Sequence, residues 1–244
     1  MAIATLERSV EVPSVIGPGR YAQLWGLIDL KKFSIATTAQ LFHYIDLALQ
    51  NPDDPNSIQI LKEFKQKKPA QCYLWNWLEK NHNPGYVEIK RRFSQEHFLS
   101  CTESYPCPGG VFVYDNLEGK PISLKELSEL YLINDPHLRF VEPGFETGFI
   151  PLADYLKNPY VIAQIGGEEM LDTVERVARA CNGREAYIMG PAYIANPVKA
   201  RTKIRRLTAL FSDVDNEKGV YLNGYYNFLS PLSYALKLPK QKAF

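Results

Sequence analysis

The sequence predicts a mixed α+β fold, in which a helical N-terminal half packs on a C-terminal half that contains a mixed sheet. Apolar residues recur at helical spacing before about residue 105, whereas short apolar runs bounded by glycine and proline follow it. A strand–helix–strand pattern at residues 160–189 is the clearest single signal. The chain has 244 residues, of which 45% are hydrophobic and 23% charged, and this composition is ordinary for a globular protein.

The predicted elements divide the chain into three segments. We expect an N-terminal arm at residues 1–19, a helical subdomain at residues 20–105 and an α/β subdomain at residues 106–244. The seam is a cluster of proline and glycine at residues 106–110. A chain of this length suits either two small units or one single domain.

Short helices are expected throughout the N-terminal half. The strongest follows Ser34 and ends at Asn51-Pro52, because five apolar residues form a stripe along one helix face. These residues are Leu41, Phe42, Ile45, Ala48 and Leu49. The other predicted helices span residues 20–33, 55–66, 70–80 and 91–100.

The C-terminal half is expected to begin with a strand at residues 111–114. Ser123 and Glu126 have the spacing of a capping box, which predicts a short helix from there to about Tyr131. The pattern at residues 160–189 then predicts a βαβ unit.

That βαβ unit consists of a strand at residues 160–165, a Gly-Gly turn, a helix at 168–181 and a strand at 186–189. A further helix is predicted at residues 198–211. Residues 220–228 suit a strand or a hairpin that turns at Asn223-Gly224.

The overall charge favours no class of partner. The formal net charge of +1 gives no general attraction to nucleic acid or to a membrane surface. The sequence has no apolar run long enough for a membrane span and begins without the apolar segment of a secretory signal. The four cysteines lack the spacing of a zinc site. We therefore expect a cytoplasmic protein with reduced thiols, and we predict no metal site.

The predicted helix 198–211 carries five cations in a stretch of eight residues. They are Lys199, Arg201, Lys203, Arg205 and Arg206. Such a helix would suit docking on a nucleic-acid backbone or on an acidic protein surface. The alternative is a solvated helix face that pairs with the acidic stretch at residues 118–175.

The candidate catalytic residues lie in loops rich in proline and glycine. His137, Glu142 and Glu146 combine an imidazole with two carboxylates, which are the groups that carry out most acid–base chemistry. Cys107 precedes two glycines closely and is a candidate nucleophile. No known catalytic motif accompanies these residues, so the sequence names neither a reaction nor a cofactor.

The candidate ligand-binding residues come from the aromatic side chains and the cation cluster. The chain has 15 Tyr, 12 Phe and 3 Trp, and tyrosine suits binding sites because its apolar ring carries a polar tip. Side chains alternate along a strand, so part of the tyrosines at residues 220–228 would face outward. Tyr221 and Tyr225, together with Arg201 and Arg205, are therefore the candidates.

Two classes of function remain open. The first is a protein that binds a small, partly apolar or aromatic molecule between the helical half and the sheet. The sequence leaves open whether such a protein is also an enzyme. The loops at residues 106–110 and 143–148 would line that pocket. The second is a non-catalytic adaptor that docks on a protein or nucleic acid through the basic helix 198–211. The sequence decides neither the ligand nor the oligomeric state.

Overall fold

The computed structural model describes residues 13–66, 78–80, 83–85, 98–107, 109–181, 185–189, 205–213, 219–226 and 233–240. Over these residues, eleven strands form one mixed sheet, and β4 and β5 form a second, two-stranded sheet. The strands of the main sheet are β1 Ser14–Gly19, β2 Phe33–Ile35, β3 Lys65–Gln66, β6 Phe98–Cys107, β7 Gly110–Asp115, β8 Leu138–Val141, β9 Gly148–Pro151, β10 Glu185–Met189, β11 Arg206–Asp213, β12 Val220–Tyr226 and β13 Ser233–Pro239. The small sheet pairs β4 Leu78–Lys80 with β5 Asn83–Gly85.

The described helices are all short, and most follow a strand or a turn of the main sheet. They are α1 Tyr21–Gly26, α2 Thr38–Gln50, α3 Pro55–Phe64, α4 Leu124–Leu132, α5 Leu152–Tyr155, α6 Pro159–Gln164 and α7 Leu171–Ala180, the last preceded by a 3₁₀ turn at Glu168–Met170.

The main sheet runs in the order β1-β13-β6-β11-β12-β10-β9, and β7 and β8 extend it from β6. The strand β6 is antiparallel to β7 and β11, whereas β10 and β12 are parallel neighbours. Near the two ends of the chain, β1 pairs with β13, so that Val15 lies opposite Leu236. Strands from distant parts of the chain therefore form a single sheet.

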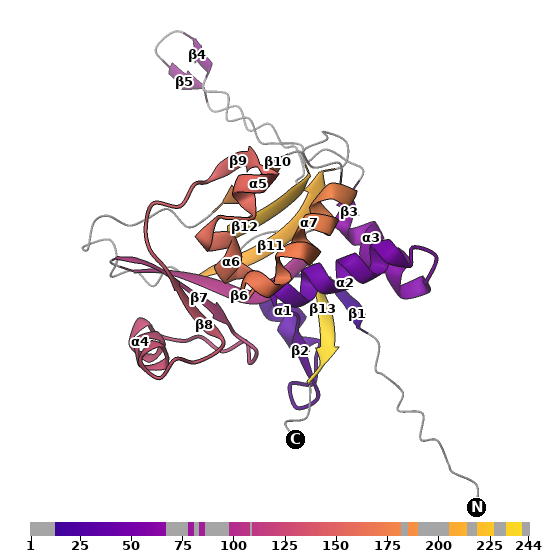
Figure 1. The fold of residues 1–244 in the computed structure, drawn as a ribbon, viewed down its shortest axis with the longest axis horizontal. Coiled ribbons are helices and arrows are strands. Elements are labelled where there is room, and N and C mark those ends of the chain that lie inside the picture. The colour runs from indigo at the N-terminus through magenta and orange to yellow at the C-terminus, as the bar shows by residue number, and fades with distance from the viewer. Residues whose placement is uncertain are drawn as a thin grey trace, which may run out of the picture.

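Helices cover both faces of this sheet. In Figure 1, α6 and α7 lie in front of β11, and α2 lies beside α7. These three helices share the largest apolar core with the sheet. The opposite face packs against α1, whose Leu24 and Trp25 join a second core with residues of β6 and β11. The helix α4 packs on β7 and β8, apart from the other helices.

Alternation along β6 brings different side chains to the two faces. Ser100 contacts Thr38 of α2, and Ser104 contacts Tyr160 of α6. Glu103 points to the opposite face, where it meets Tyr21 of α1. All ten residues of β6 are buried, so both faces of this strand are covered.

Capping side chains explain where two of the helices begin. Thr37 accepts a hydrogen bond from the Gln40 amide and starts α2, while Ser123 and Glu126 form the predicted capping box of α4. Four residues of the predicted apolar stripe of α2 are buried, namely Leu41, Phe42, Ile45 and Ala48.

The predicted combination of helices with a mixed sheet is confirmed, but a helical N-terminal half is not, because β1 and β2 lie near the start of the chain and belong to the main sheet. Residues 14–19 of the expected arm form β1. The expected seam at residues 106–110 falls in the β6–β7 hairpin, where Cys107 pairs with Gly110. The division into subdomains stays a prediction.

The predicted βαβ unit at residues 160–189 is wrong in its first element. Residues 159–164 form α6, because Asn158 caps the amides of Tyr160 and Val161 and Pro159 occupies the first helical position. The predicted helix at 168–181 and the strand at 186–189 are confirmed as α7 with its 3₁₀ turn and as β10.

The predicted basic helix 198–211 is also wrong where the structure describes it. Residues 206–213 form β11, because Leu207 and Ala209 face one core while Leu210 faces the other, and a strand between two neighbours buries both sides. Residues 198–204 lie outside the described residues.

Three further predictions have mixed outcomes. Residues 220–226 form the single strand β12 and no hairpin at Asn223-Gly224. The helices predicted at 70–80 and 91–100 lie mostly outside the described residues, but residues 78–80 and 98–100 are strands.

Candidate functional site

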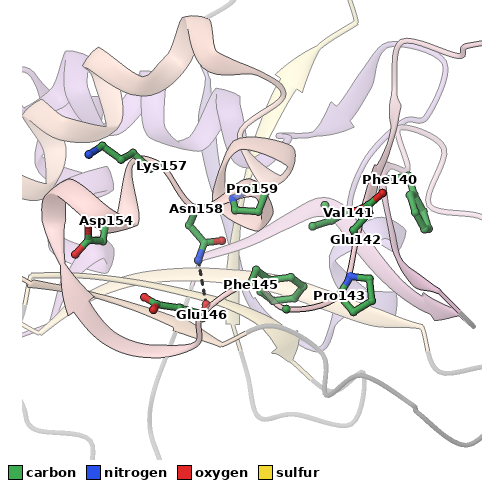
Figure 2. Close-up of a pocket in the computed structure, with 11 residues that line it drawn as sticks. Phe140, Val141, Glu142, Pro143, Phe145, Glu146, Asp154, Lys157, Asn158 and Pro159 are labelled. Carbon is green, nitrogen blue, oxygen red and sulfur yellow. Dashed lines mark hydrogen bonds between the residues drawn. The ribbon is translucent and has the colours of Figure 1, made fainter.

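A hollow of about 810 Å³ opens between the loop that joins β8 to β9 and the start of α6. Residues 140–146 form one wall. The other wall comes from α5 and the residues after it, with Asp154, Lys157, Asn158 and Pro159 (Figure 2). The hollow therefore lies between a loop of the sheet and two of the helices that cover the sheet.

Phe145 lies in the middle of the lining residues (Figure 2). Its ring stacks on the ring of Tyr160, with the centroids 4.7 Å apart and the planes 7° from parallel. Tyr160 is fully buried, whereas Phe145 is half-buried. One face of the Phe145 ring is thus covered by Tyr160, and the ring still borders the hollow.

Tyr160 is itself held from behind by a buried polar network. Its hydroxyl lies 2.7 Å from the Ser104 hydroxyl and accepts a hydrogen bond of 2.9 Å from the Gln164 amide. The Gln164 oxygen accepts a further bond from Thr208. These bonds join α6 to β6 and β11, and they fix the ring against which Phe145 stacks.

Asn158 connects the two walls of the hollow. Its side-chain amide donates to the Glu146 carbonyl at 3.0 Å, and its side-chain oxygen accepts from the Tyr160 amide at 2.9 Å. The loop between β8 and β9 turns at Gly144 and Gly148, where φ is +103° and +105°. One buried side chain therefore positions both the loop and the start of α6.

Acidic groups outnumber basic groups around the hollow. Glu142, Glu146 and Asp154 contribute carboxylates, and Lys157 contributes an ammonium. None of these four side chains forms an ion pair with any described residue. Figure 2 shows Asp154 and Lys157 at one end of the hollow and Glu142 at the other. Over the described part of the chain, no three His, Cys, Asp or Glu side chains are close enough to hold one metal ion.

A second polar cluster lies on the opposite face of β6 and is largely buried. Glu103 is fully buried, and Arg205 binds both of its oxygens, with 2.6 Å between Arg205 Nε and Glu103 Oε2. The hydroxyls of Tyr21 and Tyr105 donate to the same carboxylate, as does the side chain of Asn116. Burial, followed by the nearby Glu103 charge, raises the pKa of both tyrosines. The cluster joins α1, β6 and the start of β11.

The structure brings two of the four catalytic candidates together. Glu142 and Glu146 border the hollow. His137 is exposed just before β8, where its amide donates to Asp135. Cys107 is buried at the end of β6, and burial raises the pKa of its thiol, which disfavours the reactive thiolate.

The four ligand-binding candidates are not gathered at one site. Tyr221 belongs to a cluster of three rings with Phe149 and Tyr187 on β9, β10 and β12. Arg205 is part of the buried ion pair with Glu103. Arg201 and the side chain of Tyr225 lie outside the described residues.

Reasoning from the sequence did not single out Asp154, Lys157 or Asn158. The signal for Asn158 is the Asn-Pro pair at the start of α6, since asparagine followed by proline is a helix start. Asp154 and Lys157 carry no signal of their own, because they reach the hollow only through the packing of α5 and α6. Of the two loops expected to line a pocket, residues 143–146 border this hollow.

Comparison with protein-family models, with curated proteins and with solved structures finds no match for this chain. Among the described helices, none is both long and apolar enough to cross a membrane. The geometry of the hollow is therefore the basis for a functional proposal.

Proposed function

We propose that the protein binds a small, partly apolar organic molecule in the hollow between the β8–β9 loop and the helices α5 and α6. The observation that carries this proposal is the ring of Phe145, which is stacked on a buried tyrosine and yet borders an open hollow. A ring in this position offers an apolar contact surface to a ligand.

The support behind Phe145 favours binding. Tyr160 is held by hydrogen bonds to Ser104 and Gln164, and Asn158 fixes the loop that carries Phe145. A binding surface that is already ordered loses little conformational entropy when a ligand arrives, and more of the contact energy then appears as affinity.

A thermal-shift screen with two matched variants tests the proposal. Bound ligand stabilises the folded state, so a compound that occupies the hollow raises Tm of the unaltered protein. The Phe145→Ala variant should lose most of this ligand-induced rise. The control is Phe149→Ala. Phe149 is close to Phe145 in sequence but lies outside the hollow, so this variant should keep the ligand-induced rise in Tm. Compounds that stabilise both variants equally would place binding elsewhere.

The alternative function, an adaptor that docks through the cations at residues 199–206, draws no support from the described residues. Arg205 forms an ion pair with the buried carboxylate of Glu103, so its charge is already neutralised within the protein. The segment that follows is a central strand and presents no basic helix face.

A further inference from the structure

The charges around the hollow indicate which ligand it would take. Three carboxylates and one ammonium line it, so the lining carries a net negative charge at neutral pH. Other carboxylates of this protein are neutralised by arginines, as Asp46 is by Arg176 and Asp115 by Arg139. Glu142, Glu146 and Asp154 have no such described partner. A cationic ligand would therefore meet attraction in the hollow, and an anionic ligand repulsion.

The ring of Phe145 also favours a cationic ligand. Tyr160 covers one face of the ring, and the rest of the ring borders the hollow. The face of an aromatic ring carries negative charge density and attracts an ammonium group. Figure 2 shows the carboxylates of Glu146 and Asp154 on one side of Phe145 and that of Glu142 on the other, so carboxylates of the lining flank the ring.

The spacing of the carboxylates favours an organic cation over a metal ion. They line one hollow, but no three acidic or other ligating groups are close enough to coordinate a single ion, over the part of the chain that the structure describes. Glu142 and Asp154 lie at opposite ends of the hollow in Figure 2. Phe145 and Pro159 lie between them, and Val141 and Pro143 line the hollow near Glu142. This arrangement suits an extended molecule with a charged group and an apolar body.

From these observations we infer that the ligand of the hollow is an amine that carries an apolar or aromatic group and binds as its ammonium form. The inference rests on the proposed function, because it assumes that the hollow is a binding site. The ammonium lies against Phe145 on the side of Glu146 and Asp154, and the apolar body lies toward Val141, Pro143 and Pro159.

Three probes of nearly equal size and different charge test this inference by isothermal titration calorimetry. They are phenethylammonium, 2-phenylethanol and phenylacetate. We expect phenethylammonium to bind at least tenfold more tightly than phenylacetate, with 2-phenylethanol between them. Affinity for phenethylammonium should fall as the salt concentration rises, because the lining carboxylates are exposed and screened by ions.

Variants of the carboxylates assign the binding to the hollow. Glu146→Gln and Asp154→Asn should each weaken binding of phenethylammonium about three- to tenfold and leave that of 2-phenylethanol unchanged. The control is Glu168→Gln, which removes an exposed carboxylate that lies outside the hollow, and it should leave all three affinities unchanged.

The outcomes separate the two proposals. If phenylacetate or 2-phenylethanol binds as tightly as phenethylammonium and loses affinity in Phe145→Ala, the hollow binds ligands but the inferred charge is wrong. If the probes bind but none loses affinity in Phe145→Ala, binding lies outside the hollow and both the inference and the proposed function fail. If none of the probes binds at millimolar concentration, the inferred amine is wrong, and the thermal-shift comparison of Phe145→Ala with Phe149→Ala decides the proposed function.

Discussion

The carboxylate of Glu103 is tolerated inside this protein because four side chains satisfy it. Arg205 neutralises its charge, and Tyr21, Tyr105 and Asn116 donate hydrogen bonds to the remaining lone pairs. A buried carboxylate without these partners would be strongly destabilising. Tyr21 and Arg205 are far from Glu103 in sequence, so this residue ties α1 and the start of β11 to β6.

Removal of the Glu103 charge should therefore destabilise the fold. In Glu103→Gln, the guanidinium of Arg205 stays largely buried without a counter-charge, and we expect the free energy of unfolding to fall by about 3 kcal/mol. Urea denaturation measures this change. The matched control is Glu129→Gln, which breaks an exposed pair with Lys125 and should cost less than about 0.5 kcal/mol. Equal effects of the two substitutions would show that the buried pair contributes no more than the exposed one.

At the scale of single elements, local signals predicted several helices. The apolar stripe of α2 and the capping box of α4 depend on neighbours in sequence, and both predictions are confirmed. The strand β6 gave no such signal. Its Ser100, Thr102 and Ser104 are buried in hydrogen-bonded networks, so the strand lacks both the alternation of a half-exposed strand and the apolar run of a buried one.

The hollow was predictable only in part for the same reason. Glu142 and Glu146 lie in one short loop, and their proximity can be inferred from sequence. Asp154 and Lys157 meet that loop through the packing of α5 and α6 on the sheet, and residues 160–165 were predicted to be a strand. Because the sequence predicts a strand where α6 lies, it does not predict the wall of the hollow that Asp154, Lys157, Asn158 and Pro159 form.

The packing of α6 on β12 depends on one glycine. A Cβ atom on Gly224 would lie 1.8 Å from the Tyr160 hydroxyl, so an added methyl group would force the two elements apart. We expect Gly224→Ala to lower the free energy of unfolding by about 1–3 kcal/mol. Gly26→Ala is the control, because a Cβ there meets nothing within 4 Å. That change should be neutral or stabilising by up to about 1 kcal/mol, since alanine favours helix. Equal loss of stability in both variants would contradict this account.

Over the whole molecule, buried tyrosines and cysteines should make stability sensitive to alkaline pH. Burial raises the pKa of the following groups: Tyr21, Tyr105, Tyr155, Tyr160, Cys101 and Cys107. In the unfolded chain these groups lose their protons at about pH 8.5 for cysteine and about pH 10 for tyrosine. Above those values the unfolded state binds fewer protons than the folded state, so stability falls as pH rises.

Urea denaturation between pH 7 and 11 tests this expectation. The free energy of unfolding should change little at neutral pH and then fall above about pH 9, by about 1.4 kcal/mol per pH unit for each tyrosine that stays protonated in the fold. Tyr160→Phe should lower the slope above pH 10 by about that amount. Spectrophotometric titration of the folded protein provides the second readout, and a normal pKa near 10 for every tyrosine would contradict the prediction.

The pairing of β1 with β13 has a consequence for how the protein is made. These strands lie near opposite ends of the chain, and β13 also stands between β1 and β6 in the sheet. A nascent chain on the ribosome therefore carries β1 and β6 without the strand that joins them until β13 has been made. Contacts between residues so distant in sequence close slowly, because the entropy of a long loop is lost before the contact forms. We expect β1 to join the sheet only after translation has passed residue 239, so the apolar side chains of β1 and β6 stay without this cover until then.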